Sequence, residues 1–270
     1  MNTSVTYVLV AALVSSALGR DCSAHVPDFS SLLQAHLQVV GTKVLVGGWA
    51  KVHEALKTEQ LPPKTHAIFE QLAPEACACT IDRWDQYTVC QQATKTSTSA
   101  FSFGVMGYDP WGKYVNQNYN LIPELFDCFD HRKPGGFENN FAAVCLGAQE
   151  GELDGRMYET IPRLLKGVAN ASVLMKMDIE GSEFDVLGSL TPSDFERLSS
   201  LNVEYHFNQG RCPDSDEIDR ALRVMQHVRK HLVVVDAAAD YYGPECRVDG
   251  ALFPKMFAVS YTARSTCPSP

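Results

Sequence analysis

The stretch VLMKMDIEGSE, residues 173–183, indicates the fold class of this chain. It begins with an apolar run of strand length, and Asp178 and Glu180 follow in a turn that precedes a helical pattern. In open α/β sheets the ligands bind at the carboxyl ends of the strands, so this turn is a candidate site. Two carboxylates this close repel each other, which favours a proton on one of them and suits a general base. The alternative is a solvated acidic turn that caps the next helix.

Short apolar runs alternate with helical patterns on both sides of this stretch, which is typical of βα units on a parallel sheet. A helix is expected at Thr160, with Pro162 in its first turn. Another is expected at Ser182, where Asp185 completes a capping box. The clearest begins near Asp214 and has apolar residues on one face. The sequence therefore predicts an α/β domain over residues 95–265, whose other strands are residues 100–103, 125–129, 141–146, 201–207, 232–235 and 256–261.

The residues before this domain have a different pattern. Apolar residues recur at helical spacing from residue 28 to residue 74, with a break at Pro62-Pro63. A cysteine cluster follows at Cys77, Cys79 and Cys90, and residues 91–99 have the composition of a linker. We therefore predict a helical N-terminal extension with a cysteine cluster over residues 20–94, and a domain boundary after it.

The chain begins with a segment that is typical of a secretory signal. Residues 5–18 are apolar and small residues end the run, so a signal peptide is predicted over residues 1–19. A membrane anchor needs about 20 apolar residues, and no later stretch of the sequence approaches that length. The sequence therefore predicts a protein of the secretory pathway that has no stable membrane span. It is either secreted or located in the lumen of the Golgi or endoplasmic reticulum. The glycosylation sequon at Asn170 agrees with this route.

The nine cysteines fit an oxidising compartment. Cys77-Ala78-Cys79 lacks the Cys-x-x-Cys spacing of redox motifs, so disulfide bonding is expected there. Cys212 and Cys246 are another candidate pair, because both lie in loops around the long C-terminal helix and the strand after it. With nine cysteines, at least one remains unpaired.

The composition narrows the classes of function. With 270 residues, of which 45% are hydrophobic and 20% charged, the chain can bury a sizeable core. Acidic residues outnumber basic residues by 32 to 23, and the net charge of -9 repels a phosphate backbone. The sequence therefore predicts no nucleic-acid partner.

Three further segments contribute candidate ligand residues. Residues 101–107 read FSFGVMG, a strand that enters a loop where Gly104 lets a ligand approach the backbone, although an ordinary turn is the alternative. Asp130 follows the next strand, where a carboxylate can accept hydrogen bonds from a ribose diol or can cap a helix. Glu204 and His206 are two residues apart in a later strand and share one face. His206 is there a candidate base or substrate contact, or a core histidine.

Residues expected at the same edge of the sheet could also bind a metal ion. Asp178, Glu180 and Glu204 offer oxygen ligands, and His206 offers an imidazole. No cysteine or histidine spacing matches a zinc site. The sequence therefore predicts no metal, with binding by these four residues as the less favoured alternative.

Residues 176–187, KMDIEGSEFDVL, resemble the K-x-D-x-E-G-x-E-x-x-V-L signature of FkbM-type methyltransferases and of the related methyltransferase-like domain proteins of the secretory pathway. Residues 101–104 resemble the Y-S-F-G form of the first cofactor motif in the secretory group, and Phe129-Asp130 resembles its F-D at the second strand. Residues 83–90 are similar to a stretch that ends W-V-C. The resemblance covers residues 80–262.

This resemblance implies a Rossmann-like, S-adenosylmethionine-dependent methyltransferase with a seven-stranded sheet whose last strand is antiparallel. It implies that the backbone around Phe103 and Gly104 faces the methionine part of the cofactor and that Asp130 faces its ribose. Leu146 and Gly147 would lie against the adenine. The D-x-G-A-N-x-G form of the first motif is absent, so this motif has no acidic residue for the amino group of the cofactor.

The resemblance favours O-methylation of a hydroxyl acceptor, such as a sugar or another secretory glycoconjugate. Asp178 would lie near the amino group of the cofactor or near the acceptor, and Asp178, Glu180 and His206 are the candidate catalytic bases. Two other functions are open. S-adenosylmethionine is made in the cytosol, so a secreted protein would meet little of it. A protein that has the methyltransferase fold but does not catalyse methyl transfer would then act as a secreted binding protein. A glycoside hydrolase is the third, because Asp178-Ile179-Glu180 also resembles a D-x-E at the end of a barrel strand, but it requires eight βα repeats.

Overall fold

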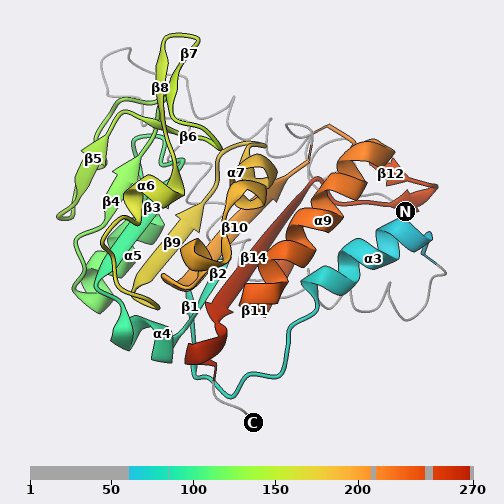
Figure 1. The fold of residues 1–270 in the computed structure, drawn as a ribbon, viewed down its shortest axis with the longest axis horizontal. Helices are drawn as coiled ribbons and strands as arrows, with labels where there is room; N and C mark the ends of the chain where they lie inside the picture. The colour runs from blue at the N-terminus through green and yellow to red at the C-terminus, as the bar shows by residue number, and fades with distance from the viewer. Residues whose placement is uncertain (1–60, 85, 208–210, 241–245, 268–270) are drawn as a thin grey trace, which may run out of the picture. The chain divides into compact units, whose positions relative to one another are not determined.

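The computed structural model describes residues 61–84, 86–207, 211–240 and 246–267, which belong to one compact unit (Figure 1). The predicted signal peptide and residues 20–60 of the predicted extension lie outside the described residues. The centre of the fold is a seven-stranded sheet with the order β11-β14-β10-β9-β3-β4-β5. Its strands are β3 (Ser99–Phe103), β4 (Glu124–Phe126), β5 (Asn140–Ala142), β9 (Val173–Met177), β10 (Leu198–His206), β11 (Leu232–Asp240) and β14 (Met256–Ala263).

The sheet is mostly parallel. Strands β5, β4, β3, β9 and β10 are parallel neighbours, whereas β14 lies between β10 and β11 and is antiparallel to both. The prediction of an α/β fold around a seven-stranded, mostly parallel sheet is therefore confirmed. The sheet is open at β5 and β11, so the described residues do not form the eight-stranded barrel that the glycoside hydrolase hypothesis requires.

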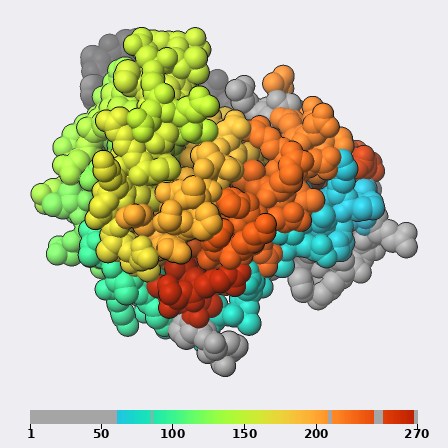
Figure 2. Space-filling model, viewed as in Figure 1, coloured from blue at the N-terminus to red at the C-terminus, as the bar shows by residue number. Residues whose placement is uncertain are grey.

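Both faces of the sheet are covered. Val173 and Met175 of β9 belong to a core that includes residues of α3 (Pro63–Leu72), α7 (Glu183–Ser189) and α9 (Ser215–His231). These three helices lie over the face that Figures 1 and 2 show, in blue, amber and orange. Leu174 faces the opposite core, with residues of α5 (Pro110–Tyr119) and of β2 (Tyr87–Cys90). A strand that is apolar on both sides is what a parallel sheet with two covered faces requires.

The predicted helix starts at Asp214 and Thr160 are confirmed. Asp214 is the N-cap of α9, and its carboxylate accepts hydrogen bonds from the backbone N–H groups of Asp216 and Glu217. These bonds satisfy donors that the first turn of a helix leaves free. Thr160 precedes α6 (Ile161–Leu164), which has proline in its first turn.

Two predicted strands end three or more residues earlier than expected. β4 ends at Phe126, because the buried carboxylate of Asp127 turns the chain by accepting hydrogen bonds from the backbone N–H groups of Val105, Met106, Phe129 and Asp130. The predicted strand at residues 141–146 is wrong, since β5 ends at Ala142 and β6 (Cys145–Leu146) joins a separate sheet. That sheet has the order β6-β8-β7, with β8 (Arg156–Glu159) and β7 (Gly151–Leu153).

The described part of the predicted extension is not only helical. After α3 come β1 (Ile81–Trp84) and β2, which form a hairpin, and the predicted linker forms α4 (Gln91–Thr96) and the start of β3. The linker prediction is wrong because Ala93 of this polar segment is buried and anchors α4. The hairpin is bonded to the main sheet: the Thr88 N–H donates to Ser260 Oγ over 2.9 Å, and Asn202 Nδ2 donates to the Thr88 carbonyl over 3.0 Å. The hairpin therefore belongs to the same fold as the sheet.

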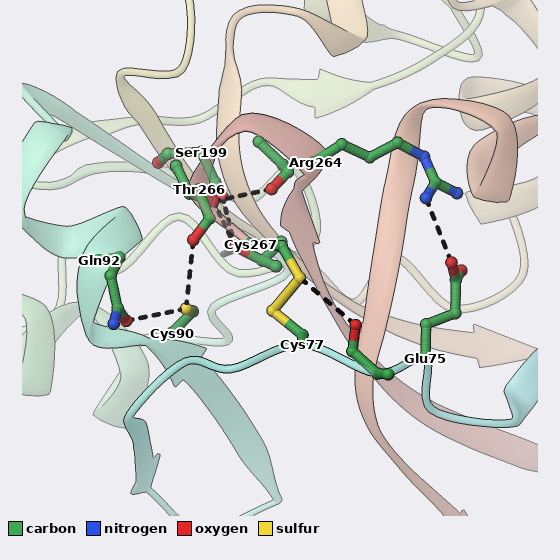
Figure 3. Close-up of a disulfide and its surroundings, with 11 residues drawn as sticks. Glu75, Cys77, Cys90, Gln92, Ser199, Arg264, Thr266 and Cys267 are labelled. Atoms are coloured by element: carbon green, nitrogen blue, oxygen red, sulfur yellow. Dashed lines mark hydrogen bonds and ion pairs between the residues drawn. A yellow bond between two sulfur atoms is a disulfide. The ribbon is translucent and has the colours of Figure 1, made fainter. Parts of the chain in front are cut away.

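Three disulfides cross-link the described chain: Cys77–Cys267, Cys128–Cys145 and Cys212–Cys246. The Cys212–Cys246 pair was predicted and is confirmed, whereas the other two pairs were not predicted. Figure 3 shows how Cys77–Cys267 holds the segment before β1 against the chain that follows η2 (Arg264–Thr266). Cys90 is a free thiol beside this disulfide, with its sulfur 3.2 Å from Gln92 Oε1. A cross-link over 190 residues removes much of the freedom of the unfolded chain.

The remaining elements are short. β12 (Arg247–Val248) and β13 (Ala251–Leu252) form a small hairpin, and α8 (Pro192–Phe195) is a single turn. Asn170 of the sequon is exposed in the turn between α6 and β9. In the part of the chain that the structure describes, no helix has the length and apolar character to cross a membrane.

Candidate functional site

Gly104 directly follows β3 and lies in a turn that contacts the end of β9. Its φ is +76°, and a Cβ at this position would stand 1.6 Å from the backbone oxygen of Asp178, so a side chain does not fit. The Asp178 N–H donates to the Phe103 carbonyl over 3.2 Å, and the Gly104 N–H donates to the Phe126 carbonyl over 3.0 Å. The carboxyl ends of β3, β4 and β9 therefore meet, and the structure brings the predicted residues Gly104 and Asp178 together.

Lys176 places a buried ammonium group beneath this turn. The ammonium donates to the carbonyl of Gly104 over 2.8 Å and to Asp178 Oδ2 over 3.0 Å. Burial opposes the charge, but the carboxylates of Asp178, Asp109 and Glu204 outweigh burial and raise the pKa of Lys176. The sequence analysis assigned no role to this lysine, although a lysine inside an apolar strand was a signal for one.

His206 faces the two predicted carboxylates from the end of β10. Its Nε2 lies 3.9 Å from Asp178 Oδ1 and 3.9 Å from Glu180 Oε2. Its Nδ1 lies 3.1 Å from Oε1 of Glu183, a fully buried carboxylate. The structure therefore brings together all three predicted catalytic residues, Asp178, Glu180 and His206.

Glu183 organises the turn between β9 and α7. Its carboxylate accepts hydrogen bonds from the N–H of Ile179 over 2.9 Å and from the N–H of Gly181 over 3.0 Å. The predicted capping box is wrong, because the Ser182 side chain makes no capping hydrogen bond and Glu183, not Asp185, binds the backbone of the turn. The sequence analysis quoted Glu183 within the signature but did not predict its role.

Glu204 shares the face of His206, as the strand alternation predicts, and it meets the β1–β2 hairpin. Its Oε1 accepts hydrogen bonds from Gln86 and Tyr87. Burial, together with the charge of Asp178, raises the pKa of Glu204 to about 7. Gln86 and Tyr87 were missed from the sequence, because nothing local shows that the hairpin folds over β10.

The protonation of His206 is set by its carboxylate neighbours. Burial lowers the pKa of His206, but the hydrogen bond to Glu183 and the charges of Glu183, Asp178 and Glu180 outweigh it and raise the pKa from 6.5 to about 9. The folded protein therefore binds this proton more tightly than the unfolded chain does. Its contribution to stability is full below about pH 6.5 and is lost as the pH rises through about 9.

We expect the free energy of unfolding to fall by about 3 kcal/mol across this pH window on account of His206. Urea unfolding in EDTA, at pH values from 6 to 9.5, measures the fall. In His206→Gln this part of the pH dependence should disappear. The matched control is His131→Gln, at an exposed histidine, which should keep it. If the free energy of unfolding changes with pH to the same extent in the wild type and in His206→Gln, this pH dependence does not come from His206.

Asp130 lies beyond the end of β4 and beside the glycine loop. A Cβ at Gly107 of this loop, where φ is +70°, would stand 3.0 Å from Asp130 Oδ2. Hydrogen bonds from Arg132 lower the pKa of Asp130 to about 2, so this carboxylate is ionised at neutral pH. The structure therefore brings Asp130 to the loop that Gly104 begins.

Two pockets lie along this edge of the sheet. One, of about 450 Å³, lies next to Asp130, between the loop after β4 and the turn that joins β7 to β8. Phe129 lines it with a ring that is 76% exposed. The other, of about 200 Å³, lies beside His206 and is lined also by Phe184 and Phe207. Exposed aromatic surface beside a pocket is what a bound ligand would cover.

None of the six predicted cofactor residues lines either pocket, although Asp130 lies between two residues that line the larger one. The Phe103 side chain is 1% exposed and stacks on Phe126, with 4.9 Å between ring centroids, so only its backbone is near the glycine turn. Leu146 is buried in the main core, and Gly147 packs against Tyr158 of β8. Neither Leu146 nor Gly147 lines either pocket. They lie elsewhere because the strand predicted at residues 141–146 divides after Ala142.

No protein-family model matches this chain, and no curated protein matches it. The function of this protein therefore has to be inferred from the geometry of the site.

Proposed function

We propose that this protein is an S-adenosylmethionine-dependent methyltransferase that methylates a hydroxyl group, such as that of a sugar or another glycoconjugate, in the secretory pathway. The observation that carries the proposal is that the glycine turn, Asp130 and Asp178 meet at the carboxyl edge of a sheet in which the last strand alone is antiparallel. The signature at residues 176–187 supports the same activity. Three disulfides and the exposed Asn170 support the compartment.

The residues beside the glycine loop fit this cofactor. The carboxylate of Asp130 is ionised and can accept hydrogen bonds from both hydroxyls of a ribose. Arg132 now binds both oxygens of Asp130 with a side chain that is 81% exposed, so a bound ribose would have to replace these hydrogen bonds. The neighbouring pocket has a size typical of sites for small molecules, and it is lined by the ring of Phe129, over which the guanidinium of Arg156 lies at 4.4 Å.

When bound, the cofactor supplies a methyl group on a positively charged sulfur. The part of the protein is to align an acceptor hydroxyl and to take its proton. With a pKa of about 9, His206 holds a proton at neutral pH as long as its Nε2 binds no metal ion, so it does not take the proton of the acceptor. Asp178, through Oδ1, and the exposed Glu180 are then the candidate bases, and the pocket beside His206 is the candidate acceptor site.

Calorimetry with S-adenosylmethionine tests the proposal. The folded, glycosylated protein should bind it, and Asp130→Ala should weaken binding about 100-fold or more, because two charge-assisted hydrogen bonds are lost. Glu152→Ala, at an exposed carboxylate on β7, is the matched control and should leave binding unchanged.

A methyltransferase fold without turnover is the second candidate, with a role as a secreted binding protein. It is favoured by the carbonyls of Phe103 and Gly104, which already accept hydrogen bonds from Lys176. Calorimetry separates the two functions. No binding by the wild-type protein would reject the enzyme and leave the second candidate, whereas binding that Asp130→Ala does not weaken would reject only the assigned ribose contact.

A further inference from the structure

Asp178, Glu204 and His206 form a cluster at the carboxyl ends of β9 and β10. One ligand atom from each residue lies within 4.8 Å of the corresponding atoms of the other two. We propose that these three side chains bind one divalent cation of the Mn²⁺ or Zn²⁺ class.

The spacing of the cluster suits a shared ion. Metal–ligand distances are about 2.0–2.2 Å, so two ligands of one ion stand about 3–4.4 Å apart, depending on the angle between them. His206 Nε2 lies 3.9 Å from Asp178 Oδ1, within this range. Glu180 Oε2 also lies 3.9 Å from Nε2, and its side chain is 73% exposed, so it can move to become a fourth ligand.

Each of the three ligand side chains has two polar atoms, and a neighbouring residue binds the atom that does not face the ion. Lys176 binds Asp178 Oδ2, which leaves Oδ1 directed at His206. Glu183 lies 3.1 Å from His206 Nδ1, which leaves Nε2 without a hydrogen-bond partner among the described residues, although the residue is only 5% exposed. Carboxylate–histidine–metal triads have this arrangement, in which the outer partner fixes the ring and its tautomer.

Glu204 is oriented in the same way. Its Oε1 accepts hydrogen bonds from Gln86 and Tyr87 of the β1–β2 hairpin, so Oε2 is the oxygen left for an ion. Glu204 is 7% exposed, and the bonds from the hairpin hold its carboxylate toward the cluster. The hairpin thus completes a support for the ligands that extends over three parts of the chain.

The charge of the cluster also favours a cation. In the part of the chain that the structure describes, four carboxylates, those of Asp178, Glu180, Glu183 and Glu204, lie around two groups that can be cationic, Lys176 and His206. A divalent cation that replaces the proton of His206 would compensate the negative charge of these carboxylates. Two carboxylates with one imidazole suit Mn²⁺, Zn²⁺ or Fe²⁺ better than Ca²⁺ or Mg²⁺, which prefer oxygen ligands alone.

A role for the ion in catalysis rests on the proposed function. A divalent cation at this edge would act as a Lewis acid on the acceptor hydroxyl and make its proton easier to remove. Binding of the ion does not depend on methyl transfer, and so it can be tested separately.

The test is a titration of the full chain, with its disulfides intact and freed of metal by EDTA, with Mn²⁺ and without S-adenosylmethionine. The electron paramagnetic resonance signal of free Mn²⁺ measures binding, and we expect one ion per chain that Zn²⁺ displaces. Glu204→Gln and His206→Gln should each weaken binding at least 10- to 100-fold. Nitrogen coupling to bound Mn²⁺, from protein with ¹⁵N-labelled histidine, should be present in the wild type and absent in His206→Gln.

Two controls sharpen this test. Glu152→Gln, at an exposed carboxylate, and Cys79→Ser, in the separate cluster of Cys77, Cys79 and Cys90, should both bind Mn²⁺ as the wild type does. Should a ligand variant fail to fold, Glu183→Gln is expected to weaken binding about 10-fold through the loss of the outer partner of His206. No Mn²⁺ bound by the wild type, or unchanged affinity in the ligand variants, overturns the inference. Binding of S-adenosylmethionine in EDTA remains a separate measurement, so a failure of either proposal can be recognised.

Discussion

Replacing Gly104 by alanine is expected to lower the free energy of unfolding by about 3–5 kcal/mol. An alanine Cβ would stand 1.6 Å from the backbone oxygen of Asp178, so the ends of β3 and β9 would have to separate. The positive φ of +76° adds strain for any residue with a side chain. Urea unfolding at constant pH measures the loss.

Gly167→Ala separates the two causes. Gly167 has a φ of +81°, and an added Cβ there meets nothing within 4 Å, so only the backbone strain of about 1–2 kcal/mol is expected. The difference between the two variants is the steric cost of placing a Cβ in the contact between β3 and β9. Equal losses in Gly104→Ala and Gly167→Ala would contradict the close approach of these two strands.

Replacing Lys176 by methionine is expected to destabilise the protein by about 3–5 kcal/mol. Methionine has a similar length, but it removes the ammonium that binds Asp178 Oδ2 and the carbonyl of Gly104. The buried carboxylates of Asp109 and Glu204 would also lose a compensating charge. Denaturant unfolding of the variant and the wild type gives the difference.

Two further variants show whether charge is the cause. Lys166→Met, at an exposed lysine, should change stability by less than about 0.5 kcal/mol. Adding Asp178→Asn to Lys176→Met should recover part of the loss, because it removes the unpaired charge. A loss below about 1 kcal/mol in Lys176→Met, or no recovery in the double variant, would show that the ammonium is not needed there.

Much of the central sheet could be predicted from the sequence. β9 has the predicted bounds, residues 173–177, because a strand buried on both faces is almost continuously apolar, with Lys176 as its one polar residue. The start of α9 was predictable from Asp214, since an N-cap acts through hydrogen bonds to residues two and three positions later. Asp178 and Asp130 were expected at the carboxyl edge because a parallel sheet brings the ends of its strands to one edge.

Other parts had no local signal. The strand predicted at residues 141–146 divides because β6 pairs with β8, a partner that periodicity cannot indicate. The helix α4 forms from a polar segment because Ala93 packs into the fold, which its composition did not suggest. The family resemblance assigned Leu146 and Gly147 to the adenine as the residues that follow the third strand, and the predicted end of that strand proved wrong.

The sequence by itself determined most of the segments that form the sheet, which carboxylates follow its strands, and that Cys212 can bond to Cys246 across the long helix. These features depend on residues near one another in the chain, where hydrophobic periodicity and turn chemistry act. Only the tertiary structure decided that Tyr87 binds Glu204, 117 residues away, and that Cys77 bonds to Cys267, 190 residues away. Such contacts form when packing brings distant segments together, and the arrangement of Asp178, Glu204 and His206 around one point depends on them.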